Sequence, residues 1–368
     1  MSMAKTDVLV IGGGIIGCAV AYELAKRGRA VTLFERGEIA GEASSAAAGI
    51  LAPQAEAKGP GPFFELCLAG HRLIPETLRE LETASGIVVP WARCGLLQLA
   101  LTEADARPLR ELAAWQRERG LPVERWDAAQ TRQREPGIEV PVLEGWFFSE
   151  ELRIDNTQFT FAYAEAARRR GVVMRTQTTV ARVRVDGGRV HGVETAAGAC
   201  EASCVVDAAG CWAQLDGGVP VPVEPARGQI LVYDSPTPHF RTIVQTPRVY
   251  AAPHPGRTLV GSTVEYVGYD KRTTDDGVAS MRRGLREIAP SLERQPIAQT
   301  WAGLRPHAPD DWPILGPTTV AGLWVAAGHF RSGILLAPIT ARLMADLIVD
   351  GHSTIDWQPF RWERFATT

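Results

Sequence analysis

A glycine-rich turn near the N-terminus constrains the fold more than any other feature of the sequence. The apolar run at residues 8–11 is typical of a short strand buried in a parallel sheet. It is followed by Gly12, Gly14 and Gly17 in the spacing G-x-G-x-x-G. In a strand-turn-helix unit, the first glycine permits a tight turn, the second lets the backbone approach a pyrophosphate, and the third lets the helix pack against the strand. This pattern predicts a dinucleotide site.

The residues after the turn complete the same unit. A helix is predicted over residues 15–27, and Gly28 is suited to end it. A second apolar strand at residues 30–34 leads into Glu35. In such units a carboxylate about 20 residues after the turn holds a ribose hydroxyl. Strand, turn, helix, strand and acid therefore all occur here in the order that a dinucleotide site requires.

An alternative interpretation of this stretch is an export signal that ends in a lipoprotein-type box at Cys18, with its charge supplied by Met1 to Lys5. An export signal needs an uninterrupted apolar region. Asp7 and the glycines interrupt this one. We therefore favour the nucleotide site and expect a cytoplasmic protein.

Composition excludes several other classes of function. A length of 368 residues favours two or three domains. A net charge of -3 with mixed signs argues against a nucleic-acid partner, and no apolar run approaches the roughly 20 residues that span a bilayer. The six cysteines lack zinc-type spacing; for the local group Cys200, Cys204 and Cys211 we favour small buried residues over a metal or redox site. The histidines are scattered, so no metal site is expected.

Nucleotide-domain features recur in the middle and at the end of the chain, with sheet-rich segments between them. We expect an α/β fold (α+β overall) in which a Rossmann-like domain is interleaved with an antiparallel-sheet substrate domain. The Rossmann-like domain is predicted to comprise residues 1–85, 145–220 and 300–368, and the substrate domain residues 86–144 and 221–299. The local patterns predict a helix at 63–85, a hairpin at 144–156, a helix at 157–170, strands joined by a turn at 186–188, a buried strand at 204–212, a helix at 275–288 and a helix that begins near residue 333.

Three segments are more specific than the glycine turn: "ASSAAAGILAP" at 43–53, "WAGLRP" at 301–306 and "AAGHFRSGILLAP" at 326–338. With the turn, they resemble the FAD-dependent amine and D-amino-acid oxidase family, and within it the bacterial glycine oxidases of thiamine biosynthesis. The resemblance covers nearly the whole chain and implies that the Rossmann-like domain binds FAD. His307 stands where sarcosine-oxidase relatives carry a flavin-linking cysteine, so we expect the FAD to be non-covalent.

The resemblance also implies which residues bind FAD. The glycine turn would hold the pyrophosphate, Glu35 the ribose, and the backbone of Val180 the adenine. Small residues suit the run that passes the flat flavin ring, and the positive N-terminus of the helix that begins near Gly333 would stabilise the reduced flavin. The full expected set is Gly12, Gly14, Ile15, Ile16, Gly17, Glu35, Arg36, Ser44, Ser45, Ala47, Ala48, Gly49, Leu51, Val180, Ala208, Gly210, Trp212, His329, Phe330, Arg331, Ser332, Gly333, Ile334 and Leu335.

For the substrate, the resemblance implies that Arg305 grips the carboxylate and that Tyr250 donates a hydrogen bond to the same group. The planar fork of arginine suits a carboxylate. Arg331 is a further candidate in the catalytic region. Two candidates mark departures from the family. Val264 stands where glycine oxidases carry a pocket methionine. Arg248 stands two residues before Tyr250, and positions two apart on a strand share a face, so one interpretation places Arg248 at the mouth of the pocket. A solvent-facing Arg248 remains the favoured alternative.

The expected activity is oxidation of glycine and small N-alkyl glycines such as sarcosine, with hydride transfer to flavin N5 and molecular oxygen as the acceptor, to give glyoxylate, amine and hydrogen peroxide. The resemblance further implies a homo-oligomer, a tetramer, and a role in thiazole synthesis. Three alternatives stay open: oxidation of a larger N-carboxymethyl or D-amino acid, a dehydrogenase that uses another electron acceptor, and a non-catalytic flavin protein.

Overall fold

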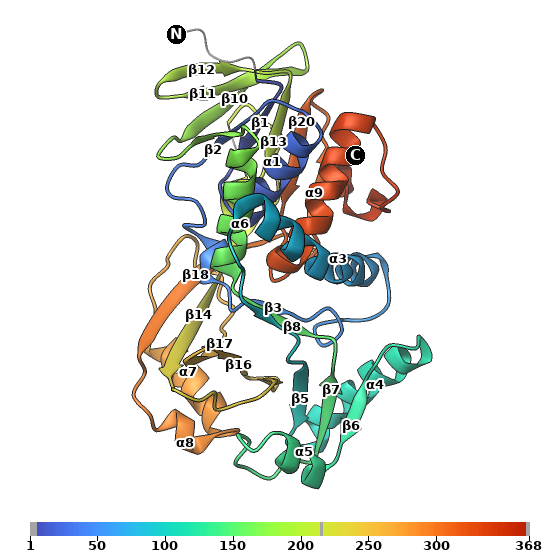
Figure 1. The fold of residues 1–368 in the computed structure, drawn as a ribbon, viewed down its shortest axis with the longest axis vertical. Coiled ribbons are helices and arrows are strands. Elements are labelled where there is room, and N and C mark those ends of the chain that lie inside the picture. The colour runs from blue at the N-terminus through green and yellow to red at the C-terminus, as the bar shows by residue number, and fades with distance from the viewer. Residues whose placement is uncertain (1–5, 214–215, 366–368) are drawn as a thin grey trace.

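The computed structural model describes residues 6–213 and 216–365. The residues of the export-signal alternative, Met1 to Lys5, fall outside this range. Strand β1 (Val8–Ile11) lies inside a six-stranded sheet at the upper end of the molecule in Figure 1. The strand order is β19-β20-β13-β1-β2-β9, parallel except for the edge strand β19. The other strands are β2 (Val31–Phe34), β9 (Val173–Arg175), β13 (Cys204–Asp207), β19 (Ile314–Pro317) and β20 (Leu323–Ala327).

Both faces of this sheet are covered, which explains why β1 is apolar at every position. Val8 and Val10 pack into a core with the helices, whereas Leu9 and Ile11 pack into a second core with the small sheet β10-β11-β12. The helices on the first face are α1 (Ile15–Lys26), α3 (Pro62–Ser85), α6 (Asn156–Arg169) and α9 (Gly333–Asp350). The strands on the second face are β10 (Val180–Asp186), β11 (Arg189–Thr195) and β12 (Gly198–Glu201).

An eight-stranded, mostly antiparallel sheet occupies the lower end of the molecule (Figure 1). Its order is β18-β14-β17-β16-β15-β5-β7-β6. The strands are β5 (Leu96–Ala100), β6 (Glu124–Trp126), β7 (Glu144–Phe148), β14 (Glu224–Asp234), β15 (Ile243–Gln245), β16 (Tyr250–His254), β17 (Arg257–Gly261) and β18 (Gln299–His307). The accompanying helices are α4 (Glu103–Glu118), α5 (Ala128–Arg134), α7 (Asp275–Arg286) and α8 (Pro290–Glu293). The remaining elements are α2 (Ala43–Ala46), β3 (Ile50–Leu51), β4 (Trp91–Ala92), β8 (Leu152–Ile154) and the short 3-10 helices η1 (Gly210–Trp212), η2 (Gln358–Phe360) and η3 (Trp362–Phe365).

The predicted fold class, the helices at α3 and α6 and the turn between β10 and β11 are confirmed. The hairpin predicted at 144–156 is wrong. Strand β7 pairs with β5 and β6, whereas β8 pairs with β3 and β4 in a separate three-stranded sheet. The predicted domain limits at 145 and 300 fall within or beside β7 and β18, and both strands lie in the eight-stranded sheet. Across residues 6–213 and 216–365, every helix is too short or too polar to cross a bilayer.

Candidate active site

A cavity of about 450 Å³ is lined by residues of both large sheets. The six-stranded sheet contributes the loops at the carboxyl ends of β1 and β13, and the eight-stranded sheet contributes β14, β16 and β18. Most of the residues predicted to bind the cofactor or substrate meet here. These are Gly12, Gly14, Ile15, Ile16, Glu35, Arg36, Ser44, Ala47, Ala48, Gly49, Val180, Ala208, Gly210, Trp212, Tyr250, Arg305, His329, Phe330, Arg331, Gly333 and Ile334.

The glycines of the β1–α1 turn are required by steric contacts. Gly12 has φ of 108°, and a Cβ there would lie 2.4 Å from the carbonyl oxygen of Ala208. A Cβ at Gly17 would lie 1.9 Å from the carbonyl oxygen of Gly12. Gly14 itself gives helix α1 no side-chain cap, and the amide of Ile15 donates to Ser44 Oγ at 2.9 Å. The positive N-terminus of α1 and the glycine turn both line the cavity. This arrangement is suited to a pyrophosphate.

Glu35 holds the backbone at the end of β2. Its carboxylate accepts hydrogen bonds from the amides of Gly13, at 2.6 Å, and Gly37, at 2.7 Å. Carboxylate oxygens have lone pairs beyond these two bonds. Glu35 can thus accept a ribose hydroxyl while it braces the turn.

Three side chains, none predicted from the sequence, support the small-residue run at 44–49. Asn156 donates through Nδ2 to the carbonyl of Ser44 at 2.6 Å, and Trp301 donates through Nε1 to that of Ala46 at 3.0 Å. His254 Nε2 lies 3.0 Å from the carbonyl oxygen of Ala48. Burial lowers the pKa of His254 to about 4, so at neutral pH the uncharged ring donates this bond. The run is therefore fixed as a cavity wall with little side-chain bulk.

The turn before α9 presents a second helix N-terminus to the cavity. Phe330 has φ of 48° and donates its amide to the carbonyl of Pro306 at 2.8 Å. Ser332 forms the N-cap without a side-chain hydrogen bond, and Gly333 and Ile334 line the cavity. His329 is buried with Nε2 3.1 Å from Thr340 Oγ1, and burial lowers its pKa to about 3. A neutral, packed histidine thus anchors the turn.

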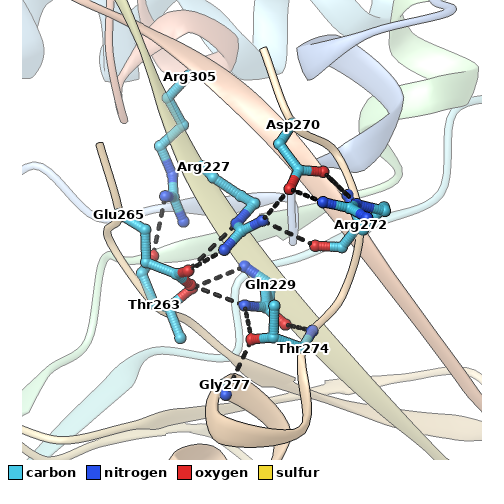
Figure 2. Close-up of polar contacts among 9 residues, drawn as sticks. All are labelled: Arg227, Gln229, Thr263, Glu265, Asp270, Arg272, Thr274, Gly277 and Arg305. Carbon is cyan, nitrogen blue, oxygen red and sulfur yellow. Dashed lines mark hydrogen bonds and ion pairs between the residues drawn. The ribbon is translucent and has the colours of Figure 1, made fainter. Parts of the chain in front are cut away.

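Charged and polar groups gather at one part of the cavity. Arg305 donates through Nη2 to Ser262 Oγ at 2.6 Å and through Nη1 to the carbonyl of Thr263 at 3.1 Å (Figure 2 shows the latter). Burial disfavours the charged form of both side chains, so it lowers the pKa of Arg305 and raises the pKa of Tyr250. Two bonds leave other N–H groups of the guanidinium available, because arginine has five donors. The site can therefore hold a small carboxylate with Arg305 and the hydroxyl of Tyr250.

Arg331 lies in the same cavity but has a carboxylate partner. Its guanidinium pairs with Glu56, with Nη2 to Oε1 at 2.6 Å and Nε to Oε2 at 3.2 Å. The charge of Glu56 raises the pKa of Arg331. Glu56 lies in a Pro/Gly-rich loop with no sequence signal that marks it as a site residue.

The structure does not place Arg248 or Val264 on the cavity wall, which agrees with the solvent-facing alternative favoured for Arg248 and differs from the pocket position expected for Val264. Strand β16 begins at Tyr250, so the alternation of faces does not extend to Arg248, which forms an exposed ion pair with Glu287. Val264 lies beyond the end of β17, and its side chain is 43% exposed. The predicted residues Gly17, Ser45, Leu51, Ser332 and Leu335 also lie off the cavity wall.

Sequence reasoning missed several lining residues, among them Glu42, Thr178 and Ser262. Ser262 lies only two positions before Val264, the residue of that segment that was predicted from the sequence. Within the part of the chain that the structure describes, His, Cys, Asp and Glu form no group of three able to hold a metal ion.

Comparison with known proteins decides the family. Residues 7–347 match the family described as DAO, FAD dependent oxidoreductase. The chain belongs to this family. FAD is therefore its cofactor, and the turn glycines, the N-termini of α1 and α9 and the small-residue run form a site that fits it.

Individual relatives within the DAO family share most of the chain. A glycine oxidase of Geobacillus kaustophilus is 34% identical over 367 residues, which cover 98% of this chain and 97% of that protein. The crystal structure of glycine oxidase from the same organism superposes with a TM-score of 0.93 at 33% identity, over 97% of this chain and 98% of the other.

Two further relatives differ in length or printed activity. The bifunctional protein ThiO/ThiG of Trichormus variabilis is 35% identical over 98% of this chain, which spans only 55% of that protein. The crystal structure of an iminodiacetate oxidase from Chelativorans sp. BNC1 gives a TM-score of 0.88 at 26% identity, over 96% of this chain and 98% of that one. The chain is thus an FAD-dependent oxidoreductase of the group that contains the glycine oxidases.

Proposed function

We propose that this chain oxidises glycine and small N-alkyl glycines such as sarcosine, with molecular oxygen as electron acceptor. The observation that carries the proposal is the meeting of Arg305 and Tyr250 in the cavity that the glycine turn and the small-residue run also line. A carboxylate held by both groups fixes the position of the α-carbon, and catalysis then depends on positioning more than on a side-chain base. FAD, when bound, supplies the two-electron chemistry by accepting a hydride and passing the electrons to oxygen.

The products follow from the loss of two electrons and two protons by the amine, as a hydride and a proton. The substrate C–N bond becomes an imine, which water hydrolyses to glyoxylate and ammonia or the alkylamine. Oxygen takes up two electrons and two protons to become hydrogen peroxide. In this proposal Gly12, Gly14 and the N-terminus of α1 hold the pyrophosphate, and Glu35 holds the ribose.

A peroxide-coupled screen tests this function. The substrates are glycine, sarcosine, N-ethylglycine, iminodiacetate, D-alanine and D-proline. We expect the highest kcat/KM for glycine or a small N-alkyl glycine, with one peroxide per substrate consumed. A preference for a D-amino acid would contradict the substrate class, and substrate-dependent flavin reduction without peroxide would contradict oxygen as the acceptor.

Glu35→Ala is expected to weaken retention of FAD about tenfold, because charge-assisted hydrogen bonds are each worth roughly 1.5–3 kcal/mol. The change removes the acceptor for the amides of Gly13 and Gly37 as well as the proposed ribose contact. FAD release is measured by ultrafiltration and flavin fluorescence. Glu38→Ala is the control, since Glu38 is a nearby acid that contacts Gln177 and does not line the cavity. Equal retention by the two variants would remove Glu35 from the cofactor site.

Glu56→Gln is expected to improve oxidation of iminodiacetate relative to sarcosine by about tenfold. In the native protein Glu56 neutralises Arg331. In this proposal the nitrogen substituent lies toward Arg331, and the neutral side chain of the Glu56→Gln variant leaves the Arg331 charge free for a second carboxylate on the substrate. The ratio of kcat/KM for the two substrates is the measurement. An unchanged ratio would show that Arg331 does not meet the nitrogen substituent.

A further inference from the structure

The segment at residues 262–274 connects β17 to α7 and carries the two groups that hold the guanidinium of Arg305. They are the hydroxyl of Ser262 and the carbonyl of Thr263. A guanidinium on a long side chain has many rotamers, so its direction depends on such acceptors. Whatever fixes this segment therefore fixes the direction of Arg305.

Strand β14 holds the first part of the segment through Arg227. The backbones of Arg227 and Glu265 exchange two hydrogen bonds, N to O at 2.8 and 3.0 Å. Their side chains form an ion pair, and Arg227 Nη1 also donates to the carbonyl of Arg272 at 3.1 Å and lies 3.3 Å from Asp270 Oδ2 (Figure 2). One arginine thus joins β14 to three points of the 262–274 segment.

Gln229, two residues further along β14, reinforces the same attachment (Figure 2). Its Nε2 donates to Glu265 Oε1 at 2.8 Å and to Thr274 Oγ1 at 3.0 Å, and its Oε1 accepts from the amide of Thr274 at 2.8 Å. Its own amide donates to Thr263 Oγ1 at 3.1 Å. The residue that supplies a carbonyl to Arg305 is therefore bonded directly to β14.

Burial makes this attachment specific. Arg227 is 4% exposed and Gln229 is fully buried. Water therefore cannot readily replace Glu265 as their hydrogen-bond partner, and loss of Glu265 would leave buried polar groups unpaired. Burial opposes ionisation of Glu265, but hydrogen bonds from Thr263, Arg227 and Gln229 outweigh it together and lower the pKa of Glu265. These bonds keep the carboxylate charged. Neither Arg227 nor Glu265 lines the cavity, so any effect on the substrate must pass through other residues.

We propose that Arg227 and Glu265 are positioning residues for substrate binding: their ion pair fixes the 262–274 segment on β14 and so aims Arg305 at the substrate carboxylate. The inference rests on the proposed function of Arg305. It predicts an effect on binding of carboxylates, with the cofactor and the chemical step largely untouched.

The test uses the FAD-loaded protein with Glu265→Gln, which keeps the shape of the side chain and removes its charge. We expect the KM for sarcosine and the dissociation constant for acetate, titrated by flavin absorbance, to rise about tenfold, with kcat changed less than about twofold. The matched control is Glu144→Gln. Glu144 is a buried carboxylate on β7 of the same sheet, paired with Arg110 and Arg125 and absent from the cavity.

A double-mutant cycle separates positioning from general loss of stability. If Glu265 acts through Arg305, adding Glu265→Gln to Arg305→Lys should raise the acetate dissociation constant by less than about twofold. Should Glu265→Gln lose its FAD or its circular-dichroism spectrum, Arg227→Lys, which keeps the charge and loses the fork, takes its place in the cycle.

The proposal is overturned by unchanged acetate binding in Glu265→Gln, by the same effect in Glu144→Gln, or by a full additional effect in the Arg305→Lys background. Failure of the proposed function has a different signature. In that case the wild-type protein oxidises none of the amino acids, or Arg305→Lys binds acetate as the wild type does.

Discussion

Arg305→Lys is expected to raise the KM for glycine or sarcosine about a hundredfold, whereas FAD content stays unchanged. The buried guanidinium is held at two nitrogens by Ser262 and Thr263, and it has further N–H groups to bind a carboxylate as a fork. Lysine is a compact point charge that cannot form the same paired contacts. Loss of a buried charge-assisted contact costs roughly 2–5 kcal/mol.

Steady-state peroxide production and acetate titration measure the effect of Arg305→Lys. Arg282→Lys serves as the control, since Arg282 pairs with Glu293 on the helical side of the same sheet and does not line the cavity. A KM within about threefold of wild type in Arg305→Lys would show that another group binds the carboxylate.

Gly17→Ala is expected to abolish FAD retention and to lower the melting temperature strongly. The added Cβ would lie 1.9 Å from the carbonyl oxygen of Gly12 and 3.5 Å from Val10 Cγ1. The first contact is with backbone, so helix α1 must move away from β1, and overpacking of this kind costs about 1–3 kcal/mol or more. The same movement displaces the N-terminus of α1 from the cavity.

Gly28→Ala, at the other end of α1, is the control for Gly17→Ala. A Cβ at Gly28 meets no atom within 4 Å, although its φ of 78° makes alanine unfavourable by about 1–2 kcal/mol. This variant should unfold at a somewhat lower temperature and still bind FAD. Similar FAD affinity in both variants would mean that the spacing between α1 and β1 does not shape the pyrophosphate site.

The nucleotide half of the fold could be predicted because its signals are local. The turn glycines, the apolar strand and Glu35 lie within one short stretch, and the close contacts of Gly12, Gly17 and Glu35 are made within it or with Ala208, directly after β13. Local patterns also predict the helix at α9, whereas the cofactor role of the small-residue run and the substrate roles of Tyr250 and Arg305 come from family resemblance. No local pattern distinguishes this tyrosine or this arginine from others in the chain.

The features that could not be predicted from the sequence depend on contacts between residues that are distant in sequence. Residues 144–156 alternate and turn like a hairpin, but their hydrogen bonds go to β5 and β6 on one side and to β3 and β4 on the other. The less favoured interpretation of Arg248, a shared face with Tyr250, does not hold because the strand begins only at Tyr250. Glu56, Asn156 and His254 act at the cavity through contacts that span more than 100 residues.

The order of strands in the six-stranded sheet sets when this protein can finish folding during synthesis. Strand β1 is translated at residue 8, but β13, its neighbour, follows at residue 204 and β20 at residue 323. Helix α9, which packs with α1 in one core and brings the second helix N-terminus to the cavity, is translated later still. High contact order of this kind slows folding, because long loops must close before the contacts form. The pyrophosphate turn is therefore synthesised hundreds of residues before the strands and the helix that bury it. We expect tight binding of FAD only after residue 350 has left the ribosome.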